Sequence, residues 1–162
     1  MTNIKNSVLA GIAFGLLFGI YLTFSSGLKN ALIAGPIAGI VFGLSMYLFI
    51  SSKKVKTQTQ IDVDDKEILY SGAANHFVNT EGVGGKLYLL NDKIVFKSHG
   101  FNIQNHEQRI DLNEVDGVIF YNTLGIIPNG LKIVLRNNVS EKFVVNNRQQ
   151  WKDEISKIKN WV

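Results

Sequence analysis

Two uncharged apolar runs dominate the first third of the chain, one from Val8 to Phe24 and the other from Ala31 to Ile50. An α-helix needs about 20 apolar residues, with about 17 as the lower limit, to cross the hydrocarbon core of a bilayer. Both runs meet that requirement, and the few polar residues between them leave room only for a turn. We therefore predict a hairpin of two transmembrane helices over about residues 8–25 and 31–50, within a membrane unit of residues 1–50.

Each apolar run carries three glycines spaced by four residues, which places them on one side of a helix. Small residues in such a stripe let two helix backbones approach closely, so we expect the glycines to pack helices. Glycine is also common in membrane helices in general, which is the alternative explanation. The pattern leaves open whether the two stripes face each other or a second copy of the protein. The six residues are Gly11, Gly15, Gly19, Gly35, Gly39 and Gly43.

Lysines flank the hairpin and predict its orientation. Lys5 precedes the first run, Lys53, Lys54 and Lys56 follow the second, and the turn holds only Lys29. Because lysine flanks favour the cytoplasmic side, we expect an integral membrane protein with two spans and both termini in the cytoplasm. The three lysines after the second run would also meet anionic lipid headgroups, within a basic polar linker over residues 51–64.

Two alternatives concern the apolar runs themselves. The first run, with Lys5 before it, also has the composition of a signal peptide, but the second run follows at once and disfavours that interpretation. Pro36 either bends the second helix or marks its first turn.

The net charge of +4 is unevenly distributed. Residues 1–60 contain five lysines and no acidic residue, whereas residues 61–162 contain 12 of the 17 basic residues and all 13 acidic ones. The second part of the chain therefore lacks the basic face that nucleic-acid binding needs, and we expect no nucleic-acid partner. Because the chain has no cysteine, it offers no disulfide or thiolate chemistry.

Turn signals recur about every ten residues after the linker, which is typical of short antiparallel strands in a barrel or sandwich. From residue 146 the period changes, because Trp151, Ile155, Ile158 and Val162 recur every three or four residues. This stripe predicts an amphipathic helix that begins at an N-cap Asn146 or Asn147, with Trp161 off the stripe and able to cover a barrel end. The expected strands lie at about 67–77, 86–90, 93–98, 107–112, 115–121, 131–136 and 142–146.

The predicted fold class is therefore α+β: two transmembrane helices followed by a seven-stranded antiparallel β-barrel capped by a C-terminal amphipathic helix. Seven strands and one final helix, over residues 65–162, describe a pleckstrin-homology-like (PH-like) barrel whose open end the helix plugs.

The sequence of this second domain resembles the GRAM family, a branch of the PH-like superfamily. The strand pair GGKLYLLNDKIVFKS at 84–98 is the specific part, and EILYSGAANHF, LGIIPNGLKI and KFVVNNRQQW match more weakly. Asn91 stands at the turn where the family often has threonine or serine, and asparagine suits that turn equally well. The resemblance implies binding of lipid headgroups or protein segments at membranes rather than catalysis, and it carries no fixed set of ligand-binding residues.

The residues that could support catalysis or metal binding are few. The spacings of His76, His99 and His106 match no compact metal motif, although the rings of the last two could meet across one loop. The GVGG segment leads into a strand rather than a helix that could hold a phosphate. An acidic cluster in the linker is explained as a solvated run opposite the lysines; it comprises Asp62, Asp64, Asp65 and Glu67. We expect no enzyme, no metal and no cofactor.

A set of lysines is the first candidate for binding anionic lipid headgroups. Lys93 and Lys97 alternate with the apolar Ile94 and Phe96, so both can point outward on one face. An ordinary solvated strand face is the alternative. The set is Lys86, Lys93 and Lys97, with Arg109 and Lys132 on later strands.

The segment LGII at 124–127 is the second candidate, because turns are normally polar. Three interpretations remain open: Leu124, Ile126 and Ile127 close the barrel core, dip into the headgroup region, or contact another subunit or membrane helix. Because Pro128, Asn129 and Gly130 can reverse the chain by themselves, we expect the apolar residues not to be needed for the turn.

Two functional hypotheses follow. In the first, the protein is a non-enzymatic binding or adaptor protein that presents a cytoplasmic PH-like domain to lipid headgroups or membrane-protein partners. The alternative is a structural or accessory membrane subunit, of scaffold or immunity type, that forms homo-oligomers through its glycine stripes.

Overall fold

The computed structural model describes residues 2–63, 66–79 and 81–159 and divides into two compact units, Met1–Thr57 and Gln58–Val162. Asp64 and Asp65 of the expected acidic cluster lie outside the described residues. The same holds for Trp161 and Val162, so their expected places beside the final helix are not described.

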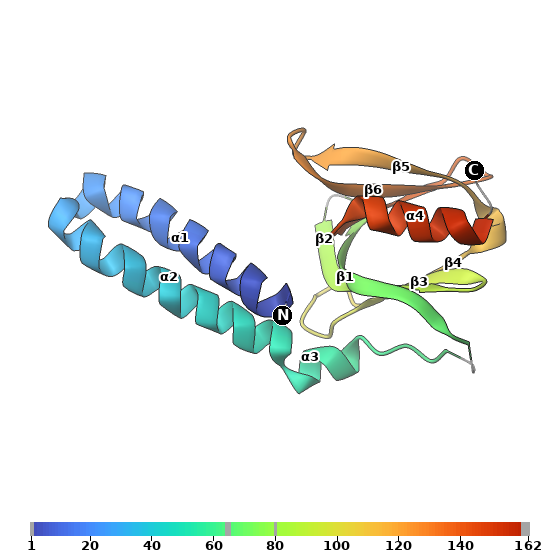
Figure 1. The fold of residues 1–162 in the computed structure, drawn as a ribbon, viewed down its shortest axis with the longest axis horizontal. Coiled ribbons are helices and arrows are strands. Elements are labelled where there is room, and N and C mark those ends of the chain that lie inside the picture. The colour runs from blue at the N-terminus through green and yellow to red at the C-terminus, as the bar shows by residue number, and fades with distance from the viewer. Residues whose placement is uncertain (1, 64–65, 80, 160–162) are drawn as a thin grey trace. The chain divides into compact units, whose positions relative to one another are not determined.

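The first unit is a pair of long helices joined at Gly27 (Figure 1). Helix α1 covers Thr2–Ser26 and α2 covers Leu28–Ser51, so both begin earlier in the sequence than expected, and α2 continues through Pro36. Gly27 makes the turn with a φ of 84°, a backbone conformation that glycine adopts at no steric cost. Both helices are long and apolar enough to cross a membrane, by length and composition.

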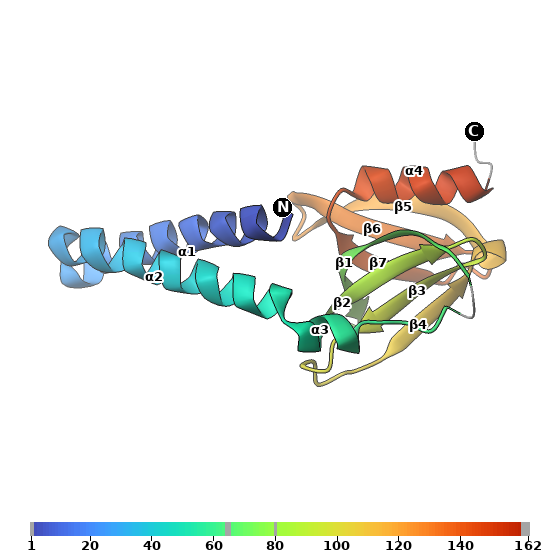
Figure 2. The ribbon, with the colours of Figure 1, turned by 60° about the horizontal axis from the view of Figure 1, so that its bottom comes forward.

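The second unit is a seven-stranded sheet in which every neighbouring pair of strands is antiparallel, with the order β4-β3-β2-β1-β7-β6-β5. The sheet curls into a PH-like half-barrel, and α4 lies against it (Figures 1 and 2). The seven predicted strands are therefore confirmed. Their bounds are β1 Ile68–Val78, β2 Glu81–Leu90, β3 Lys93–Ser98, β4 Glu107–Asp111, β5 Val115–Thr123, β6 Ile127–Leu135 and β7 Ser140–Val145, with a short 3-10 helix η1 at Leu112–Glu114.

The predicted amphipathic helix is α4, Arg148–Lys159. Trp151 and Ile155 are almost fully buried in the barrel core, and Ile158 packs at its margin. The Trp151 ring meets the Tyr70 ring edge-on, with 4.6 Å between the ring centroids. Asn147 caps the helix by accepting a hydrogen bond from the backbone N–H of Gln150, which identifies the second of the two expected caps.

The segment before the sheet is more ordered than a polar linker. Lys53–Gln58 forms the short helix α3, and Ile61 and Val63 then pack against an apolar cluster on β2 and β3. The Tyr88 hydroxyl donates a hydrogen bond to the Thr59 carbonyl at 2.8 Å. The β unit therefore begins at Gln58, before the residue 65 at which the sequence placed its start.

Candidate functional site

The two glycine stripes meet within the chain. A Cβ atom added to Gly11 would lie 2.6 Å from the Gly39 carbonyl oxygen, and one added to Gly39 would lie 2.7 Å from that of Gly11. The contact is loosest near the turn, where a Cβ on Gly19 would lie 3.8 Å from the Ala31 carbonyl oxygen. The backbones of α1 and α2 therefore touch where no side chain intervenes, and the two stripes face each other in this structure. Gly15, Gly35 and Gly43 have comparable backbone neighbours on the opposite helix.

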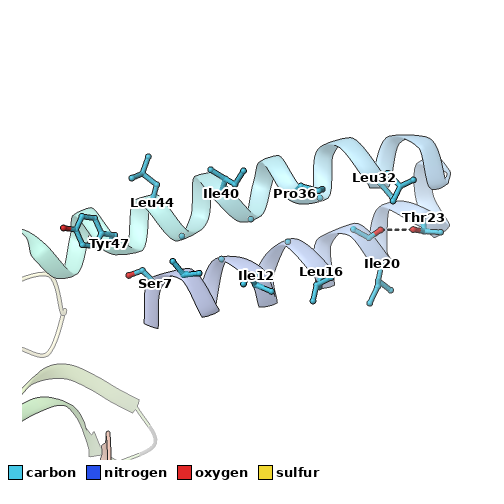
Figure 3. Close-up of a pocket in the computed structure, with 18 of the residues that line it drawn as sticks. Ser7, Ile12, Leu16, Ile20, Thr23, Leu32, Pro36, Ile40, Leu44 and Tyr47 are labelled. Atoms are coloured by element: carbon cyan, nitrogen blue, oxygen red, sulfur yellow. Dashed lines mark hydrogen bonds between the residues drawn. The ribbon is translucent and has the colours of Figure 1, made fainter. Parts of the chain in front are cut away.

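Beside the stripes, the two helices form an apolar groove of about 920 Å³ (Figure 3). Branched side chains such as Ile12, Leu16 and Ile40 line it, together with Pro36. At the turn end the Thr23 hydroxyl donates to the Gly19 carbonyl at 2.9 Å, which satisfies it within the helix. Ser7 is buried in the helix pair, and its hydroxyl has no hydrogen-bond partner among the described residues.

The three α3 lysines and the strand lysines occupy different parts of the chain. Lys53, Lys54 and Lys56 are exposed in α3. Lys86 and Lys97 are cross-strand neighbours on β2 and β3, and Lys93 lies opposite Asp111 on β4. The structure therefore brings two of the three predicted strand lysines together but leaves Lys93 at the other end of β3.

Acidic and aromatic neighbours engage the strand lysines. Lys97 donates to Glu107 at 2.9 Å, and Arg109 donates to the other oxygen of the same carboxylate at 2.6 Å. The hydrogen bond from Lys97, with that from Arg109, lowers the pKa of Glu107. The Lys86 ammonium lies 4.7 Å from the centre of the Tyr88 ring, and burial lowers the pKa of Lys86. Lys132 lies opposite Lys142 in the β6–β7 pair. Glu107 thus engages two of these cations, whereas Lys132 faces a second lysine across the strands.

The LGII segment forms the turn between β5 and β6 and lies outside the core. Leu124 and Ile126 are 84% and 80% exposed, and Ile127 is also exposed, so closure of the barrel core is the wrong interpretation. The predicted position of the turn, at Pro128, Asn129 and Gly130, is wrong as well. Leu124 (φ 53°) and Gly125 (φ 78°) reverse the chain, and Pro128 lies within β6, close to its start.

A histidine network at the ends of β1, β4 and β7 was missed by the sequence analysis. His76 is buried against the Phe96 and Phe143 rings. Its Nε2 lies 2.8 Å from Glu141 Oε2, and its Nδ1 lies 2.8 Å from His106 Nε2. His106 Nδ1 then lies 3.1 Å from the Gln104 carbonyl oxygen. His106 thus pairs with His76, whereas the sequence suggested His99 as the ring that it could meet.

The Glu141 carboxylate is the acidic member of this network. An ionised carboxylate can only accept a hydrogen bond, so His76 Nε2 is the donor to it. The hydrogen bond from His76 lowers the pKa of Glu141.

The network lines a polar cavity of about 590 Å³ at the rim of the half-barrel. Lys142 and the amide side chains of Gln104, Asn105 and Gln108 complete much of its wall. None of Lys86, Lys93 and Lys97 belongs to the lining found among the described residues. Among the residues that the structure describes, no group of three or more histidine or acidic side chains is placed to hold a metal ion.

No protein-family model matches the sequence, and no curated protein matches it. Among solved structures, the C-terminal domain of an unknown protein from Leishmania infantum is similar, with a TM-score of 0.53 and 14% identity over 60% of this chain and 87% of that one. The N-terminal PH domain of Vps36 has a TM-score of 0.48 at 9% identity, over 65% of this chain and 92% of that domain.

The PH domain of Slm1, solved in complex with inositol-4-phosphate, has a TM-score of 0.43 at 10% identity, over 56% of this chain and 95% of that domain. At such low identities the Leishmania match shows a shared fold and nothing further. The strand order and the final helix make that fold PH-like. Membership of the GRAM family stays a prediction.

The glycine contacts lead to a position-dependent prediction. Gly39→Ala should separate the helices because its methyl group would meet the Gly11 carbonyl, at a cost of about 1–3 kcal/mol. Gly19→Ala is the matched control, since its methyl group fits at 3.8 Å and alanine is the better helix former. The measurement is energy transfer, in detergent, between dyes on cysteines introduced at Ile4 and Leu48. Equal transfer in both variants and the parent would contradict a tight glycine contact.

The His76–Glu141 pair predicts a pH-dependent stability. Glu141→Gln should lower the free energy of unfolding at pH 7 by about 1–3 kcal/mol, because the charged acceptor of the His76 hydrogen bond becomes a neutral amide. The folded pKa of Glu141 is lowered, so the contribution is complete above the unfolded pKa of about 4.3 and disappears as pH falls through the folded value. The difference in the free energy of unfolding between parent and variant should therefore close below about pH 4. Denaturant titrations followed by tryptophan fluorescence measure it.

A control for this pair is Glu154→Gln, which removes an exposed ion pair with Lys157 and should change the free energy of unfolding by less than about 1 kcal/mol. A gap for Glu141→Gln that stays constant from pH 7 to pH 3 would refute the charged pair.

The strained turn predicts a stabilising substitution. A turn with two positive φ angles favours Asn-Gly, and leucine in this conformation costs about 1 kcal/mol or more. Leu124→Asn should therefore raise the free energy of unfolding of the β unit by about 1 kcal/mol in the full-length protein. Leu124→Ala should bring no such gain, because alanine lacks the polar side chain with which asparagine hydrogen-bonds to the nearby backbone in this conformation. A loss of stability in Leu124→Asn would mean that the Leu124 side chain packs inside the fold.

Proposed function

We propose that the chain is a membrane-anchored, non-enzymatic binding protein that presents its PH-like unit to lipid headgroups or membrane-protein partners at the cytoplasmic face. The observation that carries this proposal is the exposure of the two apolar helices. Only 17% and 11% of their most apolar windows are buried within the chain. The core helices of a soluble protein would be mostly buried, and leaving a leucine or isoleucine in water costs about 1.5–3 kcal/mol each.

The connection between the two units supports a role at the bilayer surface. Gln58 is already part of the β unit, and it follows Ser51, the last residue of α2, by seven positions in the sequence. Seven residues span at most about 25 Å even when fully extended. A tether this short keeps the PH-like unit at a high effective concentration near the membrane, so weak contacts are enough for binding.

The structural alternative needs another interaction surface. The two glycine stripes pack against each other in this structure. They are therefore less available for contacts between two copies of the chain. An enzymatic function finds little support in the histidine network. A catalytic base needs a nucleophilic hydroxyl or thiol within hydrogen-bond distance. The Nδ1 atom of His76 has the ring of His106 there instead.

The proposal predicts the topology of the full-length protein. A reporter fused after Val162 should be active only in the cytoplasm, because the lysines that follow α2 hold that end inside. The protein should also stay with the membrane after extraction at alkaline pH. Release by alkaline extraction would contradict the anchoring itself, whereas a reporter active only outside would contradict the orientation and the cytoplasmic partners.

A further inference from the structure

Two loops of the PH-like unit expose apolar side chains at the same end of the domain. The loop between β3 and β4 exposes Phe101 and Ile103, and the turn between β5 and β6 exposes Leu124 and Ile126. Both views show the two connections at one end of the curled sheet, with η1 at the other (Figures 1 and 2). Phe101 and Ile103 were not singled out in the sequence, although apolar residues in a polar loop carry the same signal as LGII.

The β3–β4 loop is held in one conformation by Asn102. Its Nδ2 donates to the Gly84 carbonyl at 2.7 Å and to the His99 carbonyl at 2.9 Å, and its Oδ1 accepts from the Gly84 N–H at 3.3 Å. Asn102 is thus fixed to the sheet, while its neighbour Phe101 is more than half exposed and Ile103 is fully exposed. The exposure of these two side chains results from a bonded loop rather than from a missing partner in the core.

The β5–β6 turn exposes a leucine at a position where asparagine would be more stable. Leu124 has a φ of 53°, which is unfavourable for a residue with a branched side chain. Its side chain makes little contact with the fold, since it is 84% exposed. Neither the turn geometry nor the core therefore explains a leucine here, whereas a contact outside the chain does.

The first residue of the β unit is bonded to the β3–β4 loop. The Gly100 N–H, directly before Phe101, donates to Gln58 Oε1 at 2.9 Å. Gln58 ends α3, whose exposed Lys53, Lys54 and Lys56 come directly after the apolar α2. The loop with Phe101 and Ile103 is thus bonded to the residue where a basic, membrane-proximal segment ends.

We propose that the two loop tips insert into the headgroup region of the bilayer, so that the partner of this surface is the lipid surface itself. Exposed apolar and aromatic side chains are typical of surfaces that bind at the membrane interface, and a basic segment next to a membrane helix in the sequence attracts anionic lipid. The α3 lysines supply attraction to anionic lipids, and Phe101, Ile103, Leu124 and Ile126 supply apolar area. This inference rests on the proposed membrane anchoring and names the partner of the domain.

The chain has no cysteine, so single cysteines can carry a polarity-sensitive fluorophore at chosen positions. The test uses full-length protein in vesicles of anionic lipid, labelled at Ile103 or Leu124. A label at Leu16 in α1 reports on anchoring, and one at Asn113, exposed in η1 at the opposite end of the domain, is the aqueous control. Labels at Ile103 and Leu124 should show a blue shift in emission and loss of intensity with brominated acyl chains, while Asn113 should show neither.

A second variant tests whether the loops act together. Phe101→Ser with Ile103→Ser should reduce the quenching of the label at Leu124 by at least half. The control is Ile119→Ser, which makes a comparable change at a half-exposed position on β5 and should leave quenching unchanged. Tryptophan fluorescence, which reports on the buried Trp151, verifies that each variant is folded.

The outcomes separate the inference from the function on which it rests. Quenching at Leu16 but not at Ile103 and Leu124 would overturn the loop insertion and leave the anchoring intact. Absence of quenching at Leu16 would overturn the anchoring as well. A blue shift at the loop labels in native membranes but not in pure lipid vesicles would assign the surface to a protein partner and overturn the lipid proposal.

Discussion

The attachment of residues 58–63 to the outer face of β2 and β3 is the interaction on which the organisation of the chain depends. The Thr59 carbonyl accepts from Tyr88, and Ile61 and Val63 cover an apolar cluster that would otherwise face water. Without these contacts, the connection between α2 and the β unit would be longer, because the first strand begins only at Ile68. With them, the domain starts seven residues after the last residue of α2.

The two helices of the hairpin pack backbone against backbone for a separate reason. Lipid offers no hydrophobic force that would hold two apolar helices together, so close packing and weak polar contacts must supply the attraction. Small residues at every fourth position allow that approach, and the tightest contact lies between Gly11 and Gly39, away from the turn. Large side chains such as Leu17 and Ile40 stay on the exposed faces, where acyl chains can solvate them.

Much of the fold could be predicted from the sequence because its signals are local. Apolar run length identifies the helices, turn residues delimit the strands, and the spacing of Trp151 and Ile155 identifies the buried face of α4. The β5–β6 turn was misplaced because Pro-Asn-Gly is the stronger local signal. In the structure Pro128 lies in β6 ahead of Gly130, where the pairing with β7 begins, so its missing N–H costs no bond to that strand.

The histidine network could not be predicted, because His76, His106 and Glu141 come from three separated segments and meet only through tertiary packing. The same limit applies to the role of Asn102, whose partner Gly84 lies 18 residues away. Phe101 and Ile103 differ in this respect. Their exposure follows from a polar loop with two apolar residues, a local signal that the sequence contains.

In the proposed membrane contact, basic charge and apolar area come from different segments of the chain. On the sheet, Lys97 and Arg109 share the single carboxylate of Glu107, and Lys86 lies over the Tyr88 ring. The exposed lysines of α3 are better placed for attraction to anionic lipid, since they directly follow α2. The loop tips contribute apolar area and little charge. Because Asn102 holds the β3–β4 loop from outside the core, the exposed Phe101 and Ile103 can change with little effect on the stability of the barrel.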